Sequence, residues 1–440
     1  MADAVATLLQ QLIHLSEPIR QIVSKTPYKP PEGASVSVKS VVESLLPSTG
    51  LLAKSPNLSK DDVFSEIRKF SMCCALLASS EGSTWELMNW IPKTASLAAR
   101  EAFKELEKVY IGGFGEKGLK KIDELELDCG LVEGDGKRLV VDLASELFPL
   151  LKGTIKESAI DRSDDIDQVS AACARAPVPY AILAAYQFRW FATQIGFPHL
   201  GKLCALVIPC ALTALDHWSP EVKGQGMITL IHLGNNVIAE ELGWCQDVIL
   251  DACFQNIVCS DEIWHLAVEM SVLFAVSTQK HNPRSPWFEK LLNEMLGHLE
   301  RHPRNKERRV AWLEHIEPLL NSVGIFLLAH FSRIFPLVFQ WLHADDDETV
   351  ILVLKFVQTI TKLTWIRNTP YITRLVDELS IIYKEAAMRK AREEIRMHIA
   401  HILRLLRQCK GLQFEVAWAK HKDDPNLATL EFLGNKISQQ

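Results

Sequence analysis

The sequence predicts an all-α protein, a right-handed α-solenoid of stacked helical hairpins. The first observation is the stretch from Pro198 to Val237, where apolar residues recur at the spacing of one helix face on both sides of a DHWSPE break. The two stripes are Leu200, Leu203, Val207, Ala211 and Leu215, then Val222, Gly226, Leu230, Leu233 and Val237. One hairpin cannot bury both stripes, so neighbouring hairpins must stack on it.

The second observation is the turn of this hairpin and its recurrence. Asp216, followed by Val222 and Lys223, has the pattern of a HEAT-type repeat, in which an acidic turn residue and a valine–basic pair hold two antiparallel helices. An acidic turn around Asp346 follows Asp216 at close to three repeat lengths of about 43 residues. We therefore expect HEAT/ARM-like hairpins.

Four regions follow from this interpretation. Residues 1–157 form an irregular helical region, 158–179 an acidic, proline-containing linker loop, 180–410 the HEAT/ARM-like repeats and 411–440 a C-terminal tail. Prolines separate the early helices, because a proline fixes its φ and lacks a backbone donor. Before the organising hairpin, helices are expected over Ala4–Leu15, Ser37–Leu46, Lys60–Leu77, Trp85–Ala102 with a boundary or kink at Pro92, Lys137–Leu151 and Tyr180–Ile195. After it, they are expected over Trp244–Ile257, Glu262–Val276, Ser285–Arg301, Arg308–Leu320, Ile325–Trp341, from Val350 onward, Tyr371–Ala391 and Arg392–Cys409.

Composition narrows the class of partner. The 440 residues are 48% hydrophobic and 23% charged, with a net charge of −6, which suits an extended core and argues against a general nucleic-acid binder. We expect protein partners and no nucleic acid. Ten cysteines without a CxxC arrangement indicate buried free thiols in a reducing compartment.

No targeting segment or membrane span is expected. Asp3 and the polar Gln10 and Gln11 interrupt the N-terminal apolar run, which does not resemble a secretory signal. The longest apolar candidate, Pro318–Ser332, is shorter than a membrane span and contains His330. We therefore expect a cytosolic or nuclear protein.

A glycine-rich segment, Gly112–Gly118, raises the possibility of a nucleotide site. It contains a literal GxGxxG at Gly113, Gly115 and Gly118, and Val109–Ile111 before it resembles a short strand. A dinucleotide fingerprint needs an alternation of strands and helices, which this sequence lacks. A flexible loop between helices is the favoured interpretation.

Two histidine pairs and one acidic stretch offer further chemistry. His298 with His302, and His398 with His401, have helical neighbour spacing that suits a metal, but neither has an obvious third ligand, so surface or turn histidines are favoured. The acidic stretch Ser158–Gln168 is interpreted as a solvated loop, with a phosphoacceptor at Ser163 as the alternative. We assign no catalytic residue, metal or cofactor.

Basic residues gather in two places, Arg301–Arg309 and Arg389–Arg407. A nucleic-acid groove would need them on one face with stacking aromatics, and Trp287 and Trp312 lie near enough in sequence to suggest one. In a chain of net negative charge, a solvated loop or a protein-docking patch is favoured.

Several segments resemble the TELO-interacting protein two family, the smallest subunit of the Triple T co-chaperone complex. They are Leu215–Leu233, the ELGWCQDVILDACFQNI that follows, Asn321–Leu342 and Phe356–Arg367, within a resemblance that covers roughly Gly196–Gln408. A Gly-Ile after a helix break and a Thr-Trp at a helix end recur in that family.

The resemblance implies an all-helical, non-catalytic scaffold. It implies binding to the TELO-interacting protein one and, through it, to the TELO protein. With the ninety-kilodalton heat-shock chaperone, that complex matures and stabilises phosphatidylinositol-3-kinase-related kinases. Family-matching positions include Asp216, Trp218, Pro220, Gly226, Gly324, Trp365 and Arg367. Among them Trp218, Trp365 and Arg367 are the candidate partner contacts. The alternative is another HEAT/ARM-type adaptor, of transport or phosphatase-scaffold type, with unknown cargo.

Overall fold

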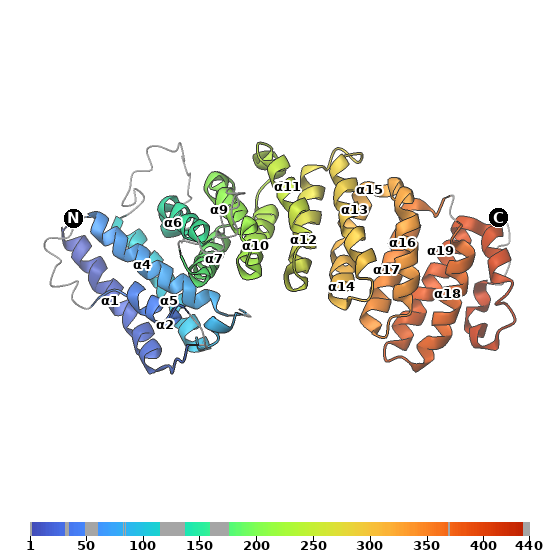
Figure 1. The fold of residues 1–440 in the computed structure, drawn as a ribbon, viewed down its shortest axis with the longest axis horizontal. Coiled ribbons are helices and arrows are strands. Elements are labelled where there is room, and N and C mark those ends of the chain that lie inside the picture. Colours follow the sequence, from blue (N-terminus) through green and yellow to red (C-terminus); the bar gives the residue numbers. More distant parts are fainter. Residues whose placement is uncertain are drawn as a thin grey trace, which may run out of the picture. The chain divides into compact units, whose positions relative to one another are not determined.

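A computed structural model describes residues 2–30, 35–48, 60–81, 83, 85–114, 137–158, 176–367 and 370–433 (Figure 1). Every regular element in these ranges is a helix, which confirms the all-α prediction. The chain divides into two compact units, Met1–Trp244 (unit 1) and Cys245–Gln440 (unit 2). Each unit is a stack of packed helical hairpins, which confirms the predicted α-solenoid class.

Unit 1 is built of two helical layers. Its elements are α1 (Ala2–Lys25), α2 (Val38–Leu45), α4 (Lys60–Ser79), η2 (Glu86–Met88), α5 (Lys93–Phe114), α6 (Arg138–Glu157), α7 (Val178–Thr193), α8 (His199–Lys202), α9 (Cys204–Asp216), α10 (Pro220–Asn236) and η5 (Ala239–Leu242). Helices α5, α6 and α9 form one layer, and α4, α7 and α10 the other, while α1 packs mainly on α5. Helix α5 begins directly after Pro92, the predicted boundary.

The hairpin of α9 and α10 confirms the predicted stripes, because all ten of their residues are buried. The two helices approach closely at Gly226, where an added Cβ would lie 2.9 Å from the Cβ of Ala214. Lys223 holds the turn through its Nζ, which donates to the carbonyl oxygen of Leu215 at 2.6 Å. Asp216, in contrast, is exposed at the end of α9, and the N-cap position of α10 is Ser219.

Unit 2 has the same two-layer arrangement. Its elements are α11 (Gln246–Asn256), α12 (Asp261–Thr278), α13 (Pro286–Arg301), α14 (Lys306–His315), α15 (Glu317–Val323), η6 (Gly324–His330), α16 (Phe331–Leu342), α17 (Asp347–Thr364), α18 (Ile372–Glu385), η7 (Ala386–Met388), α19 (Arg392–Trp418) and η8 (Pro425–Leu433). One layer contains α11, α13, α16 and α18, and the other contains α12, α14, α17 and α19. The core lies between the layers and includes the fully buried Trp264, Trp312 and Trp341.

Two kinds of loop alternate along unit 2 and define its two edges. The hairpin edge consists of the turns within hairpins, residues 257–260, 302–305, 343–346 and 386–391. The connector edge consists of the segments between hairpins, residues 279–285 and 316–330 and the described residues 365–367 and 370–371. In Figure 1 the connector of α15 and η6 lies at the top of unit 2, and the turn between α18 and α19 at the bottom.

The helix expected over Arg308–Leu320 is two helices, and this prediction was wrong. Helix α14 ends at His315, and α15 begins at Glu317 with Pro318 in its first turn. The reason is that Pro318 lacks an N–H and its ring clashes with the carbonyl four residues earlier, so the first helix cannot continue through it.

The apolar stretch in this connector is also longer than the sequence analysis found. Within Glu317–Leu342, a stretch of 26 residues, an 18-residue window has a mean hydropathy of 1.7, so the stretch has the length and composition of a membrane-crossing helix. The core helix of a soluble protein passes the same test. Here the stretch is divided into α15, η6 and α16, and Gly324, with a φ of 56°, stands between α15 and the rest of η6.

The cysteines of the described residues are free thiols. Six of them, Cys73, Cys74, Cys204, Cys210, Cys245 and Cys253, are buried, which confirms that part of the prediction. Burial raises the pKa of Cys73 and of Cys253 to about 12, so these thiols stay protonated and unreactive at neutral pH.

Candidate protein-docking surface

The three predicted contact residues fall in two different turns. Trp218 lies between α9 and α10 of unit 1 and is 48% exposed, and its ring stacks on the buried His217. Trp365 and Arg367 lie together in the turn that follows α17 of unit 2, where Trp365 is 59% exposed. The structure therefore brings two of the three into one site.

The turn after α17 has an unusual backbone. Trp365 has φ 52° and ψ 21°, and Ile366 has φ 44°, so two consecutive residues with side chains adopt the left-handed region. Each such residue costs about 1–2 kcal/mol relative to a right-handed conformation. Glycine is the usual residue where a helix ends in this way, because it has no Cβ to clash.

Hydrogen bonds and burial hold this strained turn in place. The Trp365 N–H donates to the carbonyl oxygen of Thr361 at 2.9 Å, and the Ile366 N–H donates to the Thr364 hydroxyl at 3.1 Å. The Ile366 side chain is fully buried. Because Ile366 anchors the middle of the turn, the side chains on either side of it, Trp365 and Arg367, both extend into solvent.

The connector between α15 and α16 adds exposed apolar groups to the same edge. Ile325 and Phe326, at the start of η6, are 42% and 44% exposed, and the Arg284 guanidinium lies 5.1 Å from the Phe326 ring centre. Segment η6 packs against α17. Gly324 makes this connector possible, because its φ of 56° and ψ of −128° are accessible only to glycine.

We refer to Arg284, Ile325, Phe326, Trp365 and Arg367 as the connector surface. Within the described chain, Arg367 forms no ion pair, so its charge is available to a partner. Aromatic residues beside arginines are the side chains that dominate protein interfaces. The sequence analysis missed Arg284, Ile325 and Phe326, although the Gly-Ile pair at Gly324 signalled a special turn there.

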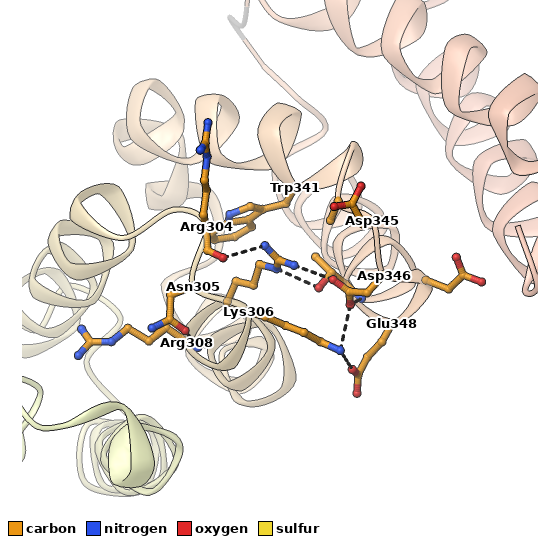
Figure 2. A network of polar contacts seen from close by, with 12 residues as sticks. Arg304, Asn305, Lys306, Arg308, Trp341, Asp345, Asp346 and Glu348 are labelled. Atoms are coloured by element: carbon orange, nitrogen blue, oxygen red, sulfur yellow. Dashed lines mark hydrogen bonds and ion pairs between the residues drawn. The ribbon is translucent and has the colours of Figure 1, made fainter.

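The hairpin edge of unit 2 carries charges that are already paired (Figure 2). Arg309 donates from Nη2 to Asp346 Oδ2 at 2.6 Å and from Nε to the Thr349 hydroxyl at 3.0 Å. Lys306 Nζ lies 2.9 Å from Glu348 Oε2 and 3.4 Å from Asp346 Oδ1. Burial acts to raise the pKa of Asp346, but hydrogen bonds from Thr349 and Arg309, with the Lys306 charge, outweigh it and hold the pKa at about 2.

The same pairing recurs at neighbouring turns. Arg308 Nε lies 2.5 Å from Asp261 Oδ1, and Arg308 also donates to the carbonyl oxygen of Cys259. Arg389 donates to Asp347 Oδ1 at 3.1 Å and to the carbonyl oxygen of Ala344 at 2.7 Å. Arg308, Arg309 and Arg389 thus tie each turn to the next, and we call them the arginine ladder.

The ladder corrects the interpretation of the basic clusters. Arg308 is only 7% exposed and Arg309 is paired with Asp346, so neither belongs to a solvated loop or a docking patch. Their positive charges form ion pairs that join neighbouring hairpins. In the Arg301–Arg309 run, Arg304 is one of the residues that stay exposed.

The first histidine pair does not form a shared site, and its His298 is buried rather than the surface or turn histidine that was expected. His298 is buried with its Nδ1 3.0 Å from Arg308 Nη1, while His302 is exposed. His398 Nδ1 accepts from Gln358 at 2.7 Å. No group of three potential metal ligands occurs among the residues that the structure describes.

The glycine-rich segment lacks the strand that a dinucleotide site requires. Val109–Ile111 and Gly112–Phe114 belong to α5, so Gly112–Phe114 are helical, where a loop was expected. Gly115 and Gly118 lie outside the described residues. So does Ser163, the alternative phosphoacceptor, while Ser158 at the start of the acidic stretch lies 3.2 Å from His217 Nε2.

These features define an α-solenoid of helical hairpins in which one edge of unit 2 is joined by arginine–carboxylate pairs and the other exposes Ile325, Phe326 and Trp365. The chain belongs to the family of an Arabidopsis thaliana protein described as "Uncharacterized protein At2g39910". The two are 52% identical over 431 residues, which are 98% of this chain and 95% of the relative. No protein-family model matches the sequence.

Solved structures show only remote similarity. An engineered protein aligns with 92% of this chain and 99% of its own at a TM-score of 0.42, and Kap121p aligns with 93% of this chain and 48% of its own at 0.32. Both are 12% identical to this chain. At these scores neither adds to the fold assignment, which depends on the packing of the helices themselves.

Proposed function

We propose that this protein is a non-catalytic scaffold subunit of a Triple T-like co-chaperone complex, and that the connector surface of unit 2 binds its protein partner. The observation that carries the docking site is the turn Trp365-Ile366-Arg367. This turn has an energetically unfavourable left-handed backbone at two non-glycine residues, and it exposes a tryptophan and an arginine.

A purely structural role explains this turn poorly. A helix that ends in the left-handed region is most stable with glycine at that position. A tryptophan there destabilises the backbone conformation and leaves apolar area in water. Trp and Arg are the residues most enriched among those that dominate binding energy. A partner that covers Trp365 supplies the missing stabilisation.

The choice of complex is supported by the sequence resemblance. Two of the segments that carry it, Asn321–Leu342 and Phe356–Arg367, contain the turns at Gly324 and Trp365, which lie on the same edge of unit 2. By this resemblance the partners are the TELO-interacting protein one and, through it, the TELO protein. The heat-shock chaperone and the phosphatidylinositol-3-kinase-related kinases then follow indirectly, in the cytoplasm or nucleus.

In this role the solenoid acts through binding alone. A subunit that binds only the folded form of its partner stabilises that partner by mass action, by RT ln(1 + L/Kd), where L is the free concentration of the subunit. Loss of the scaffold is then expected to lower the abundance of the partners and, through them, of the client kinases.

The test is an affinity purification of the tagged full-length chain from its native cells, with mass spectrometry of the co-purifying proteins. The docking variant is Trp365→Gly combined with Arg367→Gln, which removes the indole ring and the guanidinium charge, and the glycine suits the backbone of the turn. Its matched control is Met388→Ser, because Met388 is 92% exposed in unit 2 but lies on the hairpin edge.

The outcomes test separately where the partner docks and which complex the protein belongs to. Recovery of both larger subunits with the wild type and Met388→Ser, but not with the double variant, supports both parts of the proposal. Equal recovery with the double variant overturns the connector surface as the docking site. Recovery of other proteins by the wild type, without these subunits, overturns the co-chaperone role in favour of a different HEAT/ARM-type adaptor.

A further inference from the structure

Unit 1 contains a cavity with an unusual concentration of charge. Its volume is about 580 Å³, within the range of small-molecule sites. The ends of α4 and α7, the middle of α5 and the residue before α6 form its walls. Its charged lining residues are Glu81, Arg100, Lys104, Glu107, Lys137 and Arg189.

The positively charged side chains that line this cavity outnumber the negatively charged ones, and among the described lining residues only one ion pair is formed. Arg100 Nη2 lies 2.6 Å from Glu81 Oε2. Lys104, Lys137 and Arg189 form no ion pair with a carboxylate of the described residues, and Glu107 is the only other acidic side chain in the lining. The cavity is therefore a net positive site in a chain whose overall charge is negative.

Arg189 is the most informative of these side chains. Its Nη2 donates to the carbonyl oxygen of Ser79 at 3.3 Å, and its guanidinium lies 5.5 Å from the Tyr186 ring centre. Its Nε is buried and has no acceptor in the described structure. A partly buried cation without a counter-charge is unfavourable, and a bound anion removes that cost.

We propose that this cavity binds a small organic molecule that carries a phosphate group, with Arg189, Lys104 and Lys137 around the anionic oxygens. A guanidinium and two flexible ammonium groups on three different elements surround an oxyanion from several sides. The cavity is larger than a single inorganic ion needs, so the rest of the ligand has room beside the phosphate. This inference concerns unit 1 and does not depend on the docking role of unit 2.

Glu107 makes the site sensitive to pH. Burial raises its pKa to about 7, although Lys137 and Lys104 act to lower it. The other charged groups that line the same cavity are Arg100 on α5, Arg189 on α7 and Glu81 after α4. Below its pKa Glu107 becomes neutral, which removes a negative charge that repels the ligand, so anion binding is expected to strengthen as the pH falls.

Calorimetric titration of the full-length protein with inorganic pyrophosphate tests the site. The variant is Lys104→Gln combined with Lys137→Gln, and the control is Lys108→Gln, on the same helix but paired with Glu105 and outside the cavity lining. We expect saturable binding to the wild type and the control, weakened about tenfold or more in the double variant. No saturation at millimolar pyrophosphate, or equal affinity in the double variant, overturns the proposal.

Titration with sulfate, whose charge is constant near neutral pH, tests the role of Glu107. Wild-type affinity should be higher one pH unit below the Glu107 pKa than one unit above it. Glu107→Gln should bind with the higher affinity at both pH values. An equally strong pH dependence in Glu107→Gln overturns this part of the inference, and far-ultraviolet circular dichroism establishes that each variant is folded.

Discussion

On the hairpin edge of unit 2, Arg308, Arg309 and Arg389 each pair with a carboxylate of a neighbouring turn. On the connector edge, Arg367 has no such partner in the described chain and stands beside the exposed Trp365. The two edges join the same helices, yet these three hairpin-edge arginines are held in ion pairs, whereas Trp365 and Arg367 on the connector edge extend into solvent. The difference separates a surface that holds hairpins together from one that is available to a partner.

Backbone strain divides between the edges in the same way. Apart from Gly411 in α19, every described residue with a positive φ, namely Gly324, Trp365 and Ile366, lies on the connector edge. Strain concentrates where function requires a particular geometry. The following variants test whether stability resides on one edge and strain on the other.

The largest effect is expected from Arg308→Ala on the hairpin edge. Arg308 contacts Asp261, His298 and the Cys259 carbonyl, and its removal takes one hydrogen-bond donor from each of these groups. We expect a loss of about 2–3 kcal/mol in the free energy of unfolding, measured by chemical denaturation. The control is Arg304→Ala in the same run, expected within about 0.5 kcal/mol of the wild type. Equal losses in the two variants would contradict the ladder.

Gly324→Ala on the connector edge is expected to cost about 2 kcal/mol. No neighbouring atom obstructs an added Cβ, so the cost comes from the backbone conformation alone. The control is Gly153→Ala in α6, where an added Cβ also meets no neighbouring atom, and a small gain is expected because alanine favours a helix. Denaturation midpoints measure both effects. An equal loss of stability in Gly153→Ala and Gly324→Ala would show that the backbone conformation of Gly324 is not the cause.

Asp346→Asn tests the hairpin edge through pH. The folded-state pKa of Asp346 is about 2, below its ordinary 3.8, so its carboxylate stabilises the fold above about pH 3.8 and loses this contribution as the pH falls through 2. At neutral pH the variant should lose about 1 kcal/mol, because asparagine can still cap α17 but cannot form the ion pairs with Arg309 and Lys306.

The thermal midpoints of the wild type and Asp346→Asn should therefore converge as the pH is lowered from 5 toward 2. Asp345→Asn, at the neighbouring exposed position, serves as the control and should leave the midpoint nearly unchanged at every pH. A constant gap between the wild type and Asp346→Asn would show that the carboxylate charge is not what stabilises the turn.

The smallest effect on stability is expected from Trp365→Gly. Glycine relieves the left-handed strain, while the lost contacts of a side chain that is 59% exposed are modest, so the free energy of unfolding should stay within about 1 kcal/mol of the wild type. Thermal denaturation measures this. A large loss would mean that Trp365 is a structural residue and would weaken its role as a docking residue.

Much of the helical architecture was predictable from the sequence. The stripes from Leu200 to Val237 identified buried helix faces because one side of a helix recurs every three or four residues. The spacing of Asp216 and Asp346 corresponds to three hairpins, since turns at 217–219, 257–260, 302–305 and 343–346 follow in order. Trp365 at the end of a helix was also identified as exposed.

The arginine ladder could not be predicted in this way. Its partners are 37 to 47 residues apart, and in the sequence Arg308 and Arg309 belong to a basic run that is typical of a solvated loop. Only the stacking of one hairpin on the next places Asp261 and Asp346 within reach of them. The cavity of unit 1 has the same origin, because its charged residues come from four separate segments of the chain.

The sequence by itself determined where the helices form, which faces they bury and the repeat of the hairpins, because these depend on the geometry of single helices and their nearest neighbours along the chain. The tertiary structure alone decided which charged side chains form ion pairs within the fold and which remain exposed. Pairing depends on distances between loops that are remote in sequence, so Arg308 is paired with Asp261 in the fold, while Arg367 remains exposed.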